Sequence, residues 1–435
     1  MSTHPHHLMT LPGMDPHEIA QAGMLLDRIF STRHAADRVL DQHFREHHSG
    51  PGVRGRIGAV VYRVLRQRDV LTAQLQHHFP QMTPGPEAWA AMAVVALRRE
   101  AGMGDSPWPT PLSAFQAVET PFANDQLPPW QRESLPRWLW DAWCTRLGVE
   151  ETEALAQALN LPASVDVRVD MRRTTREQVR TQLAALGIEA QLTPFSPDGL
   201  RLHGRPSLSA SDPYRQGLLE FQDEGSQLIG HLVAAQPGMT VVDFCAGAGG
   251  KSLHLAVLMA DRGRIWAVDT DDARLHRLTP RIKRGRLKSI RTLPIRHEGD
   301  RALKKLQGSI HRVLVDAPCS ATGTLRRNPE VKWRLTPEVL ETFHMRQCAI
   351  LQAASRLVAP RGRLIYATCS LMMRENEDVV QGFLAENRQF HPLVSMPISH
   401  LGALQGLLPP SPFFTLLPHR TRTDGFFAAI LERKS

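Results

Sequence analysis

The sequence lacks the features that mark membrane-embedded, exported and disulfide-bonded proteins. No window reaches the roughly 18 unbroken apolar residues of a membrane-spanning helix. The start, MSTHPHHLMTLPGMDP, lacks the basic and apolar regions of a signal peptide. The five cysteines, at positions 144, 245, 319, 348 and 369, form no CxxC pair, which argues against a disulfide framework and a zinc site. We therefore expect a cytoplasmic protein that binds neither a membrane nor a metal.

The chain does contain apolar residues for several cores and a surplus of positive charge. Its 435 residues are 42% hydrophobic, which suits two or three domains. The 52 Lys+Arg exceed the 43 Asp+Glu and give a net charge of +9. Such a surplus favours a polyanionic partner, although a solvated basic surface would give the same total.

A glycine-rich turn, FCAGAGGKS at 244–252, follows the apolar run TVVD. A phosphate-binding loop needs glycine four residues before Gly-Lys-Ser, and Cys245 stands there instead. The turn also fails the G-x-G-x-x-G pattern of dinucleotide sites. The sequence thus predicts a turn that a ligand approaches closely without a strong demand for phosphate. A P-loop ATPase stays as the rival enzyme class.

The chain divides into four parts by pattern. Residues 1–14 are predicted to form a flexible tail and 15–160 a helical domain. In RGRIGAVVYRVLRQRDVL, Ile57, Val61, Val64 and Leu65 share one helical face, while Arg56, Arg63 and Arg66 lie on another side that meets RNA or water.

The second half of the chain changes to mixed strands and helices. Residues 161–222 read as a small α+β module, whose helix is capped at Thr174-Thr175 with Glu177. Residues 223–435 alternate strands and helices, which indicates a doubly wound α/β sheet of the Rossmann-like kind. Ligands bind such sheets at the carboxyl ends of the strands.

Polar residues close several of the predicted strands. Asp269 ends RIWAVD about twenty residues after the glycine turn, where a carboxylate can bind both hydroxyls of a ribose. Asp300 could accept a hydrogen bond from an adenine amino group, although a helix cap is an equal alternative for either residue. A ribose carboxylate beside a turn without a phosphate demand fits S-adenosylmethionine.

Cys319 in VDAPCSATG and Cys369 in YATCS follow the fourth and fifth strands of this sheet. In the usual 3-2-1-4-5 order these strands are neighbours, so the two thiols are expected to face one pocket. Paired thiols beside a methyl donor suggest methylation of C5 of a pyrimidine, because C5 becomes nucleophilic only after addition to C6. Cys144 and Cys348 are expected to be buried and inert.

Two basic stretches could contact RNA. The segment TLRRNPEVKWRLTPE emerges directly from the predicted active site and combines cations with an aromatic ring. Its predicted RNA-binding residues are Arg326, Arg327, Asn328, Lys332, Trp333 and Arg334. The stretch 273–291 holds eight Lys or Arg and no acid, and is a weaker candidate for phosphate contacts.

Several motifs together resemble the RNA cytosine-5 methyltransferases of the RsmB/Nol1/Nop2/Sun family. They are DFCAGAGGKS, VDTD, DAPCSATG with TLRRNPEVKW, ATCS with RENE, FQDEGSQL and DGFFAAIL, and the likeness spans about 210 residues. The resemblance implies that 161–222 is the small RNA-binding module and that 15–160 is a NusB-like domain. Four positions depart from the family pattern: Gly247-Ala248 replaces Ala-Pro, Ala321 replaces Gly, and Asp170 replaces Asn.

The resemblance also assigns roles. It implies an S-adenosylmethionine loop made of Cys245, Ala246, Gly247, Ala248, Gly249, Gly250 and Lys251, with Asp269 on the ribose and Asp300 on the adenine. Asp316 would lie between the cofactor and the cytosine N3/N4 edge. Cys369 would be the nucleophile at C6, and Cys319 would help remove the C5 proton or release the adduct. The target base must leave its stack to reach this pocket.

The expected function is therefore methylation of cytosine C5 in RNA by a monomeric enzyme that uses S-adenosylmethionine. Small-subunit ribosomal RNA is the expected substrate, because the N-terminal part resembles that branch. Transfer RNA is the alternative substrate. A non-catalytic RNA-binding factor for ribosome assembly is the alternative class of protein.

Overall fold

The computed structural model describes residues 14–101, 124–393, 404 and 411–435, so the expected flexible tail lies almost wholly outside the described residues. The chain forms two compact units. Unit 1 comprises residues 1–161 and 325–335, and unit 2 comprises 162–324 and 336–435. Within the described residues, no helix combines the length and apolarity needed to cross a bilayer.

Unit 1 is helical, as expected. Its main helices are α1 (Pro16–Ser31), α2 (Ala36–Glu46), α3 (Pro51–His78), α4 (Pro86–Glu100), α6 (Arg137–Leu147) and α7 (Val149–Asn160), with short elements η3 (Asn124–Gln126), α5 (Pro129–Arg132) and α13 (Val331–Arg334). The predicted apolar face of α3 is fully buried. Arg56 pairs with Glu18 and Arg63 with Glu100, so these arginines meet acidic partners of their own unit.

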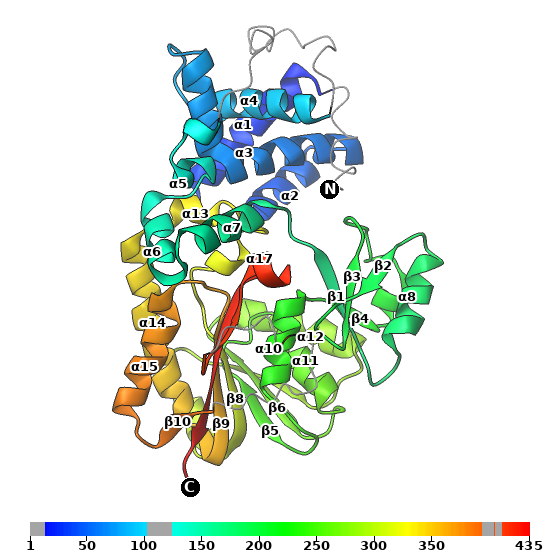
Figure 1. Cartoon of the computed structure of the whole chain (residues 1–435). Coiled ribbons are helices and arrows are strands. Elements are labelled where there is room, and N and C mark those ends of the chain that lie inside the picture. Colours follow the sequence, from blue (N-terminus) through cyan, green and yellow to red (C-terminus); the bar gives the residue numbers. More distant parts are fainter. Residues whose placement is uncertain (1–13, 102–123, 394–403, 405–410) are drawn as a thin grey trace. The chain divides into compact units, whose positions relative to one another are not determined.

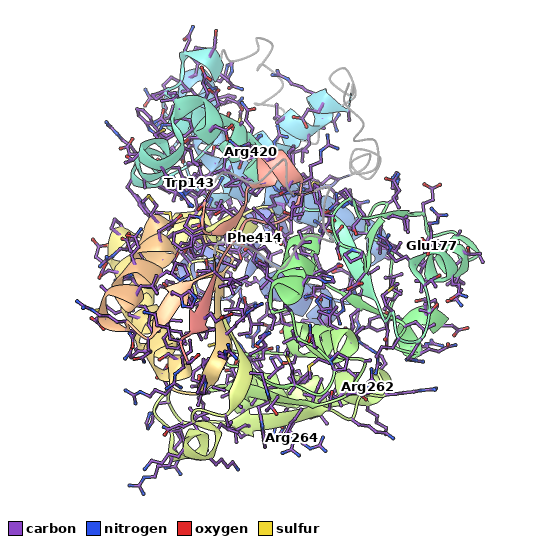
Figure 2. The ribbon with its side chains drawn as sticks, turned by 60° about the horizontal axis from the view of Figure 1, so that its bottom comes forward. Trp143, Glu177, Arg262, Arg264, Phe414 and Arg420 are labelled. Carbon is purple, nitrogen blue, oxygen red and sulfur yellow. The ribbon has the colours of Figure 1, made fainter. Side chains whose placement is uncertain are left out.

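The start of unit 2 is the small α+β module. Its sheet has the order β2-β3-β1-β4 and contains β1 (Val165–Val169), β2 (Ala190–Leu192), β3 (Gly199–Leu202) and β4 (Leu219–Phe221), with α8 (Arg176–Ala184) and α9 (Asp212–Arg215). The capping box of α8 joins Thr175 to Gln178. The predicted partner Glu177 is wrong, because the box uses the third helical residue, Gln178, and Glu177 stands one position earlier, exposed on the outside of the module (Figure 2).

The rest of unit 2 is the expected doubly wound sheet (Figure 1). The parallel strands are β5 (Thr240–Asp243), β6 (Arg264–Asp269), β7 (Ile290–Pro294), β8 (Ile310–Asp316) and β9 (Val358–Thr368). Their order, β7-β6-β5-β8-β9, is the predicted 3-2-1-4-5. Beyond β9 the sheet adds antiparallel β12 (Phe426–Arg433), which pairs with β10 (Phe390–Pro392) and β11 (Phe414–Leu416).

Alternation along the strands supplies a core on each face of the sheet. Val241 and Ile365 pack beneath α10 (Glu224–Leu232), α11 (Gly250–Leu258) and α12 (Asp272–Arg284). The next residues, Val242 and Tyr366, face η4 (Arg301–Leu306), α14 (Pro337–Ser355) and α15 (Glu377–Glu386). Figure 1 shows these two helical layers on opposite sides of the strands. Arg264 is the first residue of β6 and Arg262 stands two residues before it, so both are at the amino end of that strand (Figure 2).

A buried polar cluster that the sequence analysis did not foresee ties the module to the large sheet. Oδ2 of Asp198 lies 3.0 Å from Nε2 of His231 on α10 and 2.9 Å from Nε2 of His254 on α11. Burial would raise the pKa of Asp198, but the two hydrogen bonds hold it well below its usual value. Burial lowers the pKa of His254 to about 3, so this imidazole is neutral. Among the described residues these three have metal-ligand spacing, and here each histidine forms a hydrogen bond with Asp198.

Candidate active site

The two cysteines at the ends of β8 and β9 meet, as the strand order predicted. Asp316 of β8 lies opposite Ala367 of β9 in the parallel ladder. Three residues after Asp316 comes Cys319, and two residues after Ala367 comes Cys369. Their sulfur atoms lie 3.4 Å apart, and both side chains are partly exposed.

Glu375 holds the two cysteine loops together, and its role was missed in the sequence, where it appeared only as part of RENE. Its carboxylate is fully buried. It accepts hydrogen bonds from the amide and hydroxyl of Ser320, beside Cys319, and from the hydroxyl of Ser370, beside Cys369. Gln347 of α14 donates a further bond at 3.0 Å. One carboxylate therefore fixes the spacing of the two thiols.

The turn after Cys319 (η5, Thr322–Thr324) packs against the segment that begins β12. A Cβ on Gly323 would lie 2.3 Å from the carbonyl oxygen of Gly425, so only glycine fits. The amide of Gly323 donates to the Cys369 carbonyl at 2.9 Å. Ala321 has φ 59°, in the left-handed region that favours glycine. The resembled family has glycine at this position, so the replacement by Ala321 lies where the backbone is strained for alanine.

The glycine turn 245–251 joins β5 to α11 and is anchored to the neighbouring strand end. Gly249 has φ 80°, and a Cβ there would lie 2.2 Å from the Leu278 side chain. The amide of Gly247 donates to Oδ2 of Asp269 at 2.7 Å, while the amide of Asp271 donates to the other oxygen at 2.8 Å. The predicted ribose carboxylate is thus held directly against the turn.

Lys251 links the turn to the cysteine site. Its Nζ donates to Oδ2 of Asp316 at 2.7 Å. Burial lowers the pKa of Lys251, but the charge and hydrogen bond of Asp316 outweigh it, so the net shift is upward and the ammonium stays charged. Behind this pair, burial raises the pKa of Asp243 to about 7, opposed by a hydrogen bond from Ser252.

Cys319 holds its proton firmly. The hydrogen bond to Cys369, and then burial, raise the pKa of Cys319 well above its usual value. Cys319 is therefore a thiol whose S–H can point at the sulfur of Cys369. Burial likewise raises the pKa of Cys245 in the glycine turn. Cys144 and Cys348 are partly exposed, contrary to the expectation of burial, because each lies on a helix at the edge of its core.

Asp300 caps a helix. Its Oδ1 accepts from the amide of Ala302 in η4, and its Oδ2 accepts from the amide of Arg296, both at 2.9 Å. These bonds lower its pKa. Asp300 therefore has the helix-cap role that was its alternative, and its contact with adenine stays a prediction.

The segment 325–335 belongs to unit 1, although the sequence analysis placed it in the methyltransferase domain as an RNA-binding loop. Helix α3 is kinked at Gln67, whose φ −129° and ψ 27° are not helical. Trp333 Nε1 donates to the Leu65 carbonyl and Lys332 Nζ to the Arg66 carbonyl, each at 2.7 Å. The segment thus donates hydrogen bonds to carbonyl groups beside the kink. In an unbroken helix these carbonyls would accept from backbone amides of the same helix.

The same segment completes two further helices of unit 1. Oε1 of Glu330 accepts from the Ala36 amide at 3.0 Å, because the N-cap of α2 has no side-chain hydrogen bond of its own. Arg334 donates to the Ile29 carbonyl near the end of α1.

These contacts correct the predicted RNA-binding set. Lys332 is 1% exposed and Arg326 is 9% exposed, so neither cation faces a solvent-exposed RNA surface. Trp333 stacks beneath Arg68, whose guanidinium carbon lies 3.7 Å from the ring centre. Lys332 and Arg326 are therefore withdrawn from the predicted set, and RNA contacts by Arg327, Asn328, Trp333 and Arg334 stay predictions.

Comparisons with known proteins agree with this geometry. The family described as "16S rRNA methyltransferase RsmB/F" matches residues 231–432, and "Methyltr_RsmF/B-like, ferredoxin-like domain" matches 135–209. The "Probable ribosomal RNA small subunit methyltransferase B" of Synechocystis sp. is 34% identical over 307 residues, which cover 70% of this chain and 68% of that protein. The protein of the same description from Bacillus subtilis is 29% identical and covers 74% of this chain and 70% of its own length.

A solved structure, that of PH0851, aligns with 97% of this chain and 99% of its own at a TM-score of 0.77 and 26% identity. The relatives extend over most of both chains, and the family match contains the glycine turn and both cysteine loops. The chain belongs to the RsmB/F family of ribosomal RNA small subunit methyltransferases.

Proposed function

We propose that this protein methylates C5 of a cytosine in small-subunit ribosomal RNA through a covalent bond between Cys369 and C6 of the base. The observation that carries the proposal is the meeting of Cys319 and Cys369, 3.4 Å apart, beside the Lys251–Asp316 pair. C5 of cytosine is a weak nucleophile until a thiolate adds to C6. We place this reaction in the cytoplasm and assign it to a monomer.

S-adenosylmethionine supplies the electrophilic methyl group. The glycine turn fits this cofactor, because a Cβ built on Gly247 or Gly250 meets nothing within 4 Å and the backbone is open to a ligand. Each oxygen of Asp269 accepts one amide hydrogen, which leaves lone pairs for two ribose hydroxyls. Lys251 is neutralised by Asp316, in keeping with a ligand that carries a sulfonium in place of phosphate. Asp300 would accept from the adenine amino group with its remaining lone pairs.

The proposed division of work between the thiols follows from their hydrogen bond. Cys319 keeps its proton and can donate it across the 3.4 Å that separate the two sulfur atoms. Cys369 is therefore the thiol suited to attack C6. Asp316 would receive the N3/N4 edge of a cytosine that has left its stack.

Cys319 acts after the adduct has formed. Once Cys369 is bonded to C6, it can no longer accept the hydrogen bond that raises the pKa of Cys319. Cys319 then ionises more readily, at the stage when the C5 proton must be removed. Loss of that proton returns an electron pair to the ring and expels the Cys369 thiolate.

The proposal is tested by trapping the adduct. We expect Cys319→Ala to accumulate a denaturant-resistant complex with RNA, because methylation proceeds and release fails. The complex should disappear in the double variant with Cys369→Ala. Persistence in the double variant would overturn the assignment of the nucleophile, and absence of methylated RNA with the wild-type protein would favour the non-catalytic alternative.

The substrate needs a separate measurement. Bisulfite sequencing of RNA from cells that lack the protein should show the loss of one 5-methylcytosine in small-subunit ribosomal RNA. Loss of a site in transfer RNA, with ribosomal RNA unchanged, would move the proposal to the other substrate.

A further inference from the structure

Two arginines bind carbonyl groups of the proposed cofactor turn. Arg281 of α12 donates from a terminal nitrogen to the Ala248 carbonyl at 2.6 Å. Arg168 of β1 donates to the Gly250 carbonyl at 3.2 Å. Burial lowers the pKa of Arg168 to about 10, so its guanidinium is still charged near neutral pH. These contacts hold two carbonyl groups of the turn, whereas Asp269 holds the amide of Gly247.

Both arginines are held by the small α+β module. Glu220 of β4 accepts from Nε of Arg281 at 3.3 Å and from its other terminal nitrogen at 2.9 Å. The second oxygen of Glu220 accepts from Arg284. The Glu220 and Arg281 side chains are only 14% and 22% exposed, so solvent screens the pair weakly. Arg168 belongs to the module and donates to Gln222 beside β4.

The other hydrogen bonds of the turn hold the neighbours of Ala248: the amide of Gly247 donates to Asp269, and the amide of Gly249 donates to the Ala246 carbonyl. Gly247 has φ 55° and no neighbour within 4 Å of a Cβ position. The amide of Ala248 makes no hydrogen bond to any described residue. Ala248 also stands where the resembled family has proline, whose ring fixes φ. Among the described residues, Arg281 is therefore the one that hydrogen-bonds the backbone of Ala248 itself.

We propose that the Glu220–Arg281 pair positions the cofactor turn, in place of the proline ring that this chain lacks at residue 248. Cofactor affinity then depends on the docking of the α+β module through β4. Arg281 is a positioning residue, since it reaches the ligand only through the Ala248 backbone. This inference rests on the proposed function insofar as 245–251 is the S-adenosylmethionine turn.

The test measures S-adenosylmethionine binding to the full chain by titration calorimetry. Arg281→Met should raise Kd about tenfold, because a charged hydrogen bond to the turn is lost. Glu220→Gln should raise Kd less, because Arg281 keeps its contact with Ala248. At saturating cofactor the turnover of both variants should stay near the wild-type value. Arg277→Met, an exposed arginine of the same helix, is the matched control with unchanged Kd.

The decisive comparison uses Ala248→Pro, which restores the ring and breaks no hydrogen bond of the Ala248 amide. In that background Arg281→Met should change Kd by about twofold at most, because the ring already supplies the restraint. The same tenfold loss in both backgrounds would overturn the proposal. If the proline variant does not fold, the single variant still tests the proposal. Equal Kd values for the wild type and Arg281→Met would then overturn it.

A different result is expected if residues 245–251 are not the S-adenosylmethionine site. Asp269→Asn should weaken S-adenosylmethionine binding if the turn is the cofactor site. Binding that is unchanged in Asp269→Asn would overturn that assignment, together with the inference built on it. Weak binding in Asp269→Asn with normal binding in Arg281→Met would overturn the positioning role alone.

Discussion

The loop that carries Cys319 and the segment that directly follows it serve different units of the molecule. Cys319 is fixed by Glu375, Ser320 and Ser370, all within unit 2. Residues 325–335 complete helices α1, α2 and α3 of unit 1. Continuity of the chain with a reactive centre therefore does not make a residue part of that centre. Substitutions in the first region should change chemistry, and those in the second should change stability.

The largest expected effect lies in the first region. Cys369→Ala should lower turnover by about 10⁴-fold or more, because the nucleophile is removed. Its affinity for S-adenosylmethionine should be unchanged, since Cys369 is outside the glycine turn. Single-turnover methylation and titration calorimetry measure the two quantities.

Cys348→Ala is the matched control, because Cys348 is a partly exposed cysteine of α14 that takes no part in the thiol pair. If both variants turned over as fast as the wild type, Cys369 would not be the nucleophile. The two regions would then not differ in their effect on the chemistry.

The second region should respond to pH through Lys332. Burial lowers the pKa of this residue to about 7 from the ordinary 10.5, and a neutral amine still has two N–H groups for the Arg66 carbonyl and Asn160 Oδ1. Between these two pKa values the unfolded chain binds more protons than the folded chain. The free energy of unfolding should therefore rise with pH from about 7 to about 10, by up to about 1 kcal/mol per unit, and Lys332→Met should lose this rise.

Urea unfolding of the full chain at pH 7, 8 and 9 checks the slope. Lys283→Met, which removes an exposed lysine of α12, should keep the wild-type slope. If Lys332→Met keeps it too, the lysine is not buried as described. A weakened salt dependence of RNA binding in that variant would restore the original interpretation of a phosphate contact.

The contrast also explains how far the sequence could be interpreted. Strand order and the alternation of buried residues follow from local pattern and general rules of parallel sheets, so the meeting of Cys319 and Cys369 could be predicted. The role of Lys332 depends on a kink at Gln67, some 265 positions away, which no local pattern reveals. Glu375 was hidden for a related reason, because its partners lie on two separate loops.

The smallest expected effect concerns the turn after Cys319, within the first region. Ala321 adopts φ 59° in the turn after Cys319, a conformation that costs an L-residue more than glycine. Ala321→Gly should therefore stabilise unit 2 by up to about 1 kcal/mol. The gain is reduced because glycine gives the unfolded chain more conformational entropy. Thermal unfolding measures the gain, and Ala302→Gly in η4, a position without positive φ, should instead destabilise. Because Glu375 already fixes the cysteine spacing, turnover should not change, and a large change in turnover would mean that the strained turn itself positions Cys319.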